Sequence, residues 1–175
     1  MNKKSKKKIE SLLNFDFFFS LLREPAHKNF DLILCIKLMS CKTVCKIRVR
    51  YGETDQMGYV YYGNYALYLE QARTDWLRKM GHTYKSLEAE NVLLPVTQLS
   101  INYHAPGHYD DLLEIETTLI QKPAVKIEFS YTIYNQENKR LVTAQTTLAF
   151  VDKKTGKIRQ APDYLLESID KNMKS

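Results

Sequence analysis

The longest helical pattern in this chain is GNYALYLEQARTDWLRKMG, residues 63–81. Its apolar residues recur at spacings of three and four, which places them on one face of a helix of about four turns. Gly81 is expected to end this helix, because glycine readily adopts the left-handed backbone found just after a helix. The apolar face consists of Tyr65, Leu69, Ala72, Trp76 and Met80.

Strand patterns lie on both sides of this helix. Residues 43–51 alternate between apolar and polar side chains, as a half-buried strand does. Residues 82–91 predict a short helix or turn, and four further strands are predicted at 94–103, 113–119, 125–133 and 142–151, with turn residues between them. We interpret the last four strands as an antiparallel meander. The long helix is the only candidate to cover the sheet, so the fold class is α+β.

The segment RYGETDQMGYVYYGNY, residues 50–65, joins the first strand to the helix. Asp55 lies directly before the turn Gln56-Met57-Gly58, so its carboxylate could project from the sheet as a nucleophile or a base. An Asp before a glycine turn also commonly binds backbone amides in an Asx-turn. The residues alone leave both interpretations open.

This segment resembles the 4-hydroxybenzoyl-CoA thioesterase family, whose members carry an Asp two residues after an acidic residue, then a Gly, then an aromatic pair leading into a helix. The resemblance extends from about residue 43 to about residue 164. It implies a hotdog fold, in which an antiparallel five-stranded sheet wraps around one long central helix. It also implies a thioester hydrolase, specifically an acyl-CoA thioesterase that releases CoA and a carboxylic acid.

The resemblance assigns roles to particular positions. Asp55 would be the nucleophile or the general base, and the backbone amide of Tyr62 at the helix start would polarise the thioester carbonyl. Many relatives have His where this chain has Tyr62, so a role that needs an imidazole does not carry over, whereas a backbone role does. The expected substrate-binding residues are Gly58, Val60, Tyr61, Gly63, Tyr65, Leu94 and Val96.

Two other carboxylates, those of Glu53 and Glu70, are also candidates for a role in the site. Glu53 precedes it by two residues, and we interpret it as structural, with tuning of Asp55 as a secondary role. Glu70 lies on the helix, where other hotdog thioesterases carry a catalytic Glu, and it could pair with Arg73 three residues later. A hotdog hydratase, which uses an Asp and His pair, is disfavoured because no His lies within twenty residues of Asp55 in the sequence.

Two further functions stay open. The substrate could be carried on acyl carrier protein instead of CoA, or the chain could be an acyl-binding module without turnover. The family forms dimers by pairing sheets edge to edge, and often tetramers, so we expect a homo-oligomer.

Charge and composition argue against other partners. The net charge of +6 is concentrated in residues 1–42, which hold nine Lys or Arg against four Asp or Glu, so the remainder is nearly neutral and no nucleic acid is expected. Cys35, Cys41 and Cys45 show no CxxC spacing, and the four histidines form no HxH or HxxxH pair within one predicted helix or strand, because His104 and His108 lie across a Pro-Gly turn. We therefore expect no metal, no cofactor, reduced thiols and a cytoplasmic protein.

The first 42 residues combine a Lys run with short apolar clusters. Charged and polar residues interrupt these clusters, so neither a secretory signal nor a membrane-spanning segment is expected. We expect residues 1–42 to be an extension outside the fold, with Met39 as an alternative start, residues 43–165 to form the hotdog thioesterase domain, and residues 166–175 to be a C-terminal tail.

Overall fold

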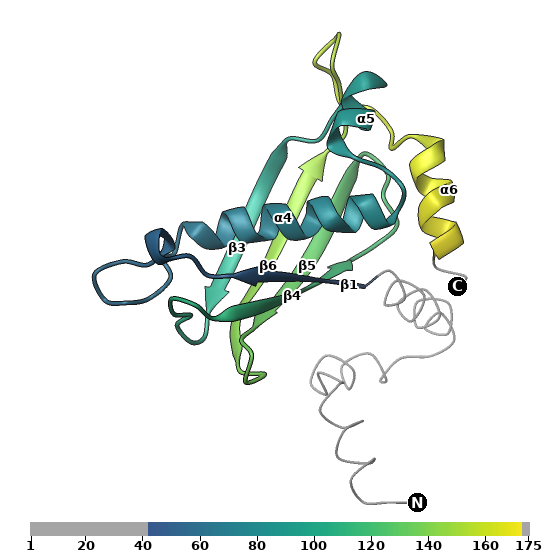
Figure 1. Cartoon of the computed structure of the whole chain (residues 1–175). Helices are drawn as coiled ribbons and strands as arrows, with labels where there is room; N and C mark the ends of the chain where they lie inside the picture. Colours follow the sequence, from purple (N-terminus) through teal and green to yellow (C-terminus); the bar gives the residue numbers. More distant parts are fainter. Residues whose placement is uncertain (1–41, 173–175) are drawn as a thin grey trace, which may run out of the picture. The chain divides into compact units, whose positions relative to one another are not determined.

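The computed structural model describes residues 42–172, and the expectations for residues 1–41 lie outside this range. Figure 1 shows one long helix lying across a curved sheet. The elements in chain order are β1 (Thr43–Arg48), the 3-10 helix η1 (Tyr51–Glu53), α4 (Asn64–Lys79), α5 (Tyr84–Ala89), β2 (Val92–Leu93), β3 (Val96–Tyr103), β4 (Leu112–Leu119), β5 (Lys126–Tyr134), β6 (Arg140–Ala149), β7 (Val151–Asp152) and α6 (Asp163–Asn172).

The main sheet has five strands in the order β1-β4-β5-β6-β3, and all neighbouring pairs are antiparallel. The expected four-stranded meander is therefore wrong in one respect. Strands β4, β5 and β6 do form a meander, but β3 joins the far side of β6, and β1 occupies the free side of β4. Side-chain alternation reveals which residues form strands, whereas the choice of neighbour depends on long-range packing.

Helix α4 buries the predicted apolar face against this sheet. Its residues Tyr65, Leu69, Ala72 and Trp76 and the following Met80 are each at most 3% exposed. The Trp76 ring meets the ring of Phe129 edge to face, with centroids 4.9 Å apart. Each large side chain buried in this way stabilises the fold by about 1.5–3 kcal/mol. Among residues 42–172, no helix is both long and apolar enough to cross a membrane.

The middle strands also follow the predicted alternation. In β5, Ile127, Phe129, Tyr131 and Ile133 are buried, and the residues between them are more exposed. Val125 is 40% exposed and lies before β5 begins, so the strand starts one residue later than predicted. Pro95 separates β2 from β3, because proline has no N–H for the strand ladder.

Helix α6 was not predicted from the sequence. It spans part of the stretch expected to be a tail, and its residues Leu165 and Ile169 are fully buried. Because these side chains are four apart, they lie on one face of the helix and face the body of the domain. The packed part of the chain therefore continues beyond the boundary expected at residue 165.

Strand β3 forms one edge of the sheet, and seven of its eight residues are exposed. Three of them are large apolar or aromatic residues: Val96 is 44% exposed, Leu99 42% and Tyr103 50%. An exposed edge strand presents unpaired backbone groups that can pair with another strand. This edge therefore offers a surface for association.

Candidate active site

The loop between β1 and α4 is closed by contacts across its neck. The carbonyl oxygen of Glu53 accepts hydrogen bonds from Tyr61 N at 2.9 Å and from Asn64 Nδ2 at 2.7 Å. Thr54 and Val60 face each other in an isolated antiparallel bridge. The first residue of helix α4 thus helps to hold residues 55–59 as a short turn.

Asp55 lies at the base of that turn and is half-buried. Its Oδ1 accepts hydrogen bonds from Met57 N at 2.9 Å and Tyr59 N at 3.4 Å, and its backbone carbonyl accepts from Gly58 N at 3.0 Å. Gly58 has a φ of +75°, a conformation that glycine adopts without strain. The Asx-turn is therefore present. Within residues 42–172 no donor binds Oδ2, so the turn fixes one oxygen of Asp55 and leaves the other open to a ligand.

The Glu53 carboxylate is held by Tyr68 and by the backbone of Arg50. Its Oε2 accepts hydrogen bonds from Tyr68 Oη at 2.7 Å and from Arg50 N at 2.8 Å. Burial, and then the hydrogen bond to Glu53, raise the pKa of Tyr68, so this hydroxyl stays a donor. These contacts agree with a structural role for Glu53.

The start of helix α4 presents backbone donors. Tyr61 O accepts a hydrogen bond from Asn64 N at 2.9 Å, and the N-terminal cap residue Gly63 supplies no side-chain cap. In the part of the chain that the structure describes, neither Tyr62 N nor Gly63 N has a hydrogen-bond partner. The helix dipole adds partial positive charge here, so this end of the helix suits developing negative charge.

The side chains of Tyr61 and Tyr62 lie on the surface beside these amides. They are 45% and 64% exposed, and their ring centroids are 4.5 Å apart. A Cβ atom at Gly63 would come within 2.9 Å of the Tyr61 ring, so glycine allows that ring to lie over the backbone. The pair thus forms an exposed aromatic surface at the helix start.

Two of the expected substrate-binding residues are buried beneath the loop. Val60 is 5% exposed and Tyr65 is 2% exposed. Val60 N donates to Gly107 O at 2.8 Å, and a Cβ atom at Gly107 would lie only 3.2 Å from the Tyr65 hydroxyl. Their side chains therefore support the loop from beneath within this chain.

Leu94 and Val96 are not brought to the loop within one chain. Tyr103 at the end of β3 donates a hydrogen bond to Tyr62 O at 3.2 Å, so that end of the strand lies beside the helix start. Val96 is at the opposite end of this eight-residue strand, about 23 Å away at 3.3 Å per residue. The two expected parts of the substrate site are thus separated in a single subunit.

His108 lies beside the loop, although it is distant from the loop in the sequence. Its Nδ1 lies 3.3 Å from Gly58 O, and its ring meets the ring of Tyr59 edge to face at 5.3 Å. Distance along the chain was therefore a poor argument against a histidine near Asp55. No hydrogen bond joins His108 to the Asp55 carboxylate within residues 42–172. The only local signal was the turn Ala105-Pro106-Gly107, which gives no hint of what it contacts.

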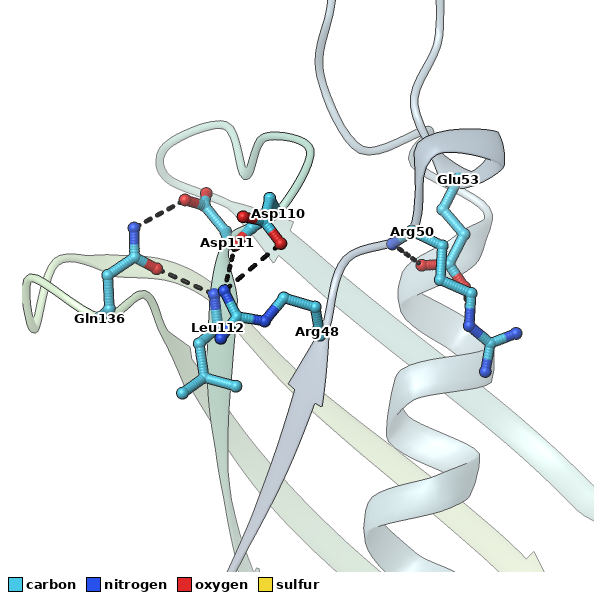
Figure 2. Close-up of polar contacts among 7 residues, drawn as sticks. All are labelled: Arg48, Arg50, Glu53, Asp110, Asp111, Leu112 and Gln136. Carbon is cyan, nitrogen blue, oxygen red and sulfur yellow. Dashed lines mark hydrogen bonds and ion pairs between the residues drawn. The ribbon is translucent and has the colours of Figure 1, made fainter.

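A buried carboxylate, that of Asp111, organises the turn that carries His108. Figure 2 shows the contacts that link Asp111, Gln136 and Leu112. Asp111 is 8% exposed, its Oδ2 accepts from His108 N, and its Oδ1 accepts from Gln136 Nε2, both at 2.8 Å. Gln136 Oε1 in turn accepts from Leu112 N at 2.9 Å. Both oxygens of Asp111 are therefore used to fix the turn against the sheet.

Glu70, the alternative catalytic carboxylate, forms an ion pair with Arg73. Its Oε2 lies 3.1 Å from Arg73 Nη2, and Arg73 also donates from Nε to Tyr84 Oη at 3.2 Å. Glu70 lies eight residues after Tyr62, about 12 Å along the helix axis. The expected ion pair with Arg73 is present, and it holds Glu70 away from the helix start.

Comparison with known proteins gives a consistent result. Residues 49–169 match the model of the thioesterase-like superfamily. The chain is 35% identical over 120 residues to the acyl-CoA thioester hydrolase YbgC of Escherichia coli, which covers 69% of this chain and 90% of that protein. It is 30% identical to a solved DHNA-CoA thioesterase of Staphylococcus aureus, with a TM-score of 0.70 over 74% of this chain and 89% of that one. The hotdog fold is thereby confirmed, and the chain belongs to the thioesterase-like superfamily.

Proposed function

We propose that this chain is an acyl-CoA thioesterase that uses Asp55 and the backbone amide of Tyr62. Its family membership makes it a thioester hydrolase. The observation that carries the rest is the unbound Oδ2 of Asp55 on the same closed loop as the unbound amide of Tyr62. A nucleophile or base beside a donor for the carbonyl oxygen is what acyl transfer needs.

Two routes use this pair. Asp55 can attack the thioester carbon and form a mixed anhydride, which water then cleaves, or it can take a proton from a water that attacks directly. In both routes the C–S bond breaks, CoA leaves as the thiolate and then takes up a proton, and the acyl group is released as a carboxylic acid. A thiol with a pKa near 8.5 leaves readily as the thiolate, so the site needs a carbonyl donor more than a strong acid.

We further propose that two subunits pair through β3 and complete the substrate site. Edge-to-edge antiparallel pairing would bring Val96 and Leu94 of the partner subunit beside Tyr103 and Tyr62 of the first. It would cover the exposed apolar residues of β3. It also resolves the separation of about 23 Å between the two expected parts of the site.

The test compares the wild-type protein with Asp55→Asn on short, medium, long and aromatic acyl-CoA esters, with release of thiol as the signal. The amide oxygen of Asn can still accept the two turn hydrogen bonds, so the loop should hold its conformation. We expect kcat to fall at least about a thousandfold, as for loss of a group that acts directly on the reacting atoms. Asp110→Asn, at an exposed carboxylate on the neighbouring turn, is the matched control and should keep full activity.

The outcomes separate the competing functions. Full activity in Asp55→Asn would contradict the proposal and make Glu70 the next residue to change. Absence of turnover by the wild type on every CoA ester, with activity on acyl carrier protein esters, would move the substrate to the carrier protein. Tight acyl-CoA binding without turnover, unchanged in Asp55→Asn, would identify a binding module.

A further inference from the structure

The carbonyl oxygen of Tyr62 is held from outside helix α4. Tyr103 Oη donates to it at 3.2 Å from a position 41 residues later in the chain. In a regular α-helix this carbonyl would accept from the N–H four residues on, which is that of Ala66. Here Ala66 N bonds to Gly63 O at 3.2 Å instead. Strand β3 therefore supplies a donor that the helix itself does not.

Both peptide planes beside the Tyr62 Cα are consequently fixed. Asn64 N binds Tyr61 O and sets the plane that contains Tyr62 N–H. Tyr103 Oη binds Tyr62 O and sets the next plane, which contains Gly63 N–H. In a planar trans peptide the C=O and N–H groups point in opposite directions, so holding a carbonyl also aims the N–H of the same plane. The two unbound amides at the helix start are thus aimed by two hydrogen bonds.

Tyr103 itself is well anchored. Its ring meets the buried ring of Tyr65 edge to face, with centroids 5.6 Å apart and an interplanar angle of 64°. Burial, and then the nearby phenol of Tyr62, raise the pKa of Tyr103, so its hydroxyl remains a donor at neutral pH. Half of the side chain is exposed, so removing the hydroxyl alone opens no cavity in the core.

We propose that Tyr103 is a positioning residue for thioester hydrolysis, and that its hydroxyl holds the peptide plane after Tyr62, so that the Gly63 amide stays aimed at the thioester oxygen beside the Tyr62 amide. This inference rests on the proposed function. The hydrogen bond from a pre-oriented amide to that oxygen becomes strongest when negative charge develops there in the transition state. Loss of the Tyr103 hydroxyl should therefore slow the chemical step more than it weakens substrate binding.

The kinetic test is Tyr103→Phe, which removes one oxygen and keeps the ring. We expect kcat to fall about five- to tenfold, the size of one neutral hydrogen bond, with KM and oligomer mass unchanged. Tyr109→Phe is the matched control, because Tyr109 is also an exposed tyrosine, packs its ring on that of Tyr51 and has no hydroxyl hydrogen bond within residues 42–172. An unchanged kcat, or a change confined to KM, would overturn the inference.

A second measurement does not depend on turnover. In ¹⁵N–¹H NMR spectra, Tyr103→Phe should shift the amide resonances of Tyr62 and Gly63, whereas Tyr109→Phe should leave both unchanged. The inference requires this result as well as the kinetic one. If the wild type cleaves no thioester, the proposed function fails, and unmoved Tyr62 and Gly63 resonances would by themselves reject a positioning role for Tyr103.

Discussion

Helix α4 with its sheet and the loop with its neighbouring turn are built by different kinds of contact. The core depends on many apolar contacts whose residues recur with a regular period, such as the fully buried Trp76 and Leu69. The site depends on a few directional hydrogen bonds between segments about fifty residues apart, such as His108 Nδ1 to Gly58 O at 3.3 Å. A regular period can be recognised locally, whereas a contact between two loops cannot.

The core and the site also differ in how much they contribute to the free energy of folding. Apolar burial in the core supplies most of the free energy of folding, and it tolerates changes of similar volume. The site contributes little apolar burial, since Met57 is 71% exposed and Tyr62 is 64% exposed. Changes in the core should therefore act on stability, and changes in the loop on catalysis. The turn at residues 104–111 joins both regions and should affect both.

The largest loss of stability is expected for Trp76→Ala. The side chain is fully buried and packs edge to face on Phe129, so its removal should lower the free energy of unfolding by about 3–5 kcal/mol. Urea unfolding followed by circular dichroism, at fixed protein concentration, measures this loss. Leu67→Ala, 61% exposed on the same helix, should change stability by less than about 0.5 kcal/mol. Equal losses for the two variants would break the contrast between core and surface.

Asp111→Asn tests the turn. Both carboxylate oxygens accept from donors, His108 N and Gln136 Nε2, so an amide nitrogen would face one of these donors. We expect a loss of about 1–3 kcal/mol of unfolding free energy, together with a lower kcat because the turn supports the loop. The exposed Asp110→Asn should cost almost nothing in the same unfolding and turnover assays. Full activity in Asp111→Asn would show that the loop does not depend on this turn.

The sequence was sufficient for the long helix, for the five main strands and for the turn at Asp55. The apolar face of α4, its end at Gly81 with φ of +86°, and the alternation in β5 all follow from local spacing. The turn at Asp55 also follows from local chemistry, since Asp before Gly favours an Asx-turn. These features depend on residues close together in the chain, so their physical cause is visible in the sequence.

Other features could not be obtained in this way. The position of β3 next to β6, and the contact of Tyr103 with Tyr62, depend on how distant segments pack. Helix α6 is a different case, because its signal was present: Leu165 and Ile169 are four residues apart after Pro162 and Asp163, an arrangement typical of a helix start. That omission was one of interpretation, whereas the order of the strands has no local signal.

Gly107→Ala tests how tightly the turn at residues 104–111 packs on the core. The added Cβ would lie 3.2 Å from the Tyr65 hydroxyl, 3.3 Å from Val60 Cγ2 and 3.4 Å from Leu141 Cδ1. These neighbours must move apart slightly, and we expect a loss of about 1–2 kcal/mol in urea unfolding. At Gly52 a Cβ would meet nothing within 4 Å, so Gly52→Ala should be neutral or slightly stabilising. A neutral Gly107→Ala would mean that the turn and the helix can separate without cost.

The smallest effect concerns a part-buried polar contact between β1 and α4. Cys45 Sγ lies 3.1 Å from Asp75 Oδ2, and burial, followed by the hydrogen bond to Asp75 and its charge, raises the pKa of the thiol from 9.0 to about 12. The folded protein keeps this proton at a pH where the unfolded chain releases it. The resulting stabilisation is therefore fully present below pH 9 and is lost as the pH rises from 9 toward 12.

In Cys45→Ala this pH dependence should disappear. Between pH 8 and pH 10 the wild type should lose about 1 kcal/mol more unfolding free energy than the variant, within the limit of about 1.4 kcal/mol per pH unit for one proton. Buried tyrosines such as Tyr131, whose pKa is raised to about 12, titrate with the same sign, but they are present in both proteins and cancel in the difference. Urea midpoints at pH 8, 9 and 10 measure it. Parallel curves would show that the Cys45 thiol is no harder to ionise in the folded protein, and that apolar burial alone describes this part of the core.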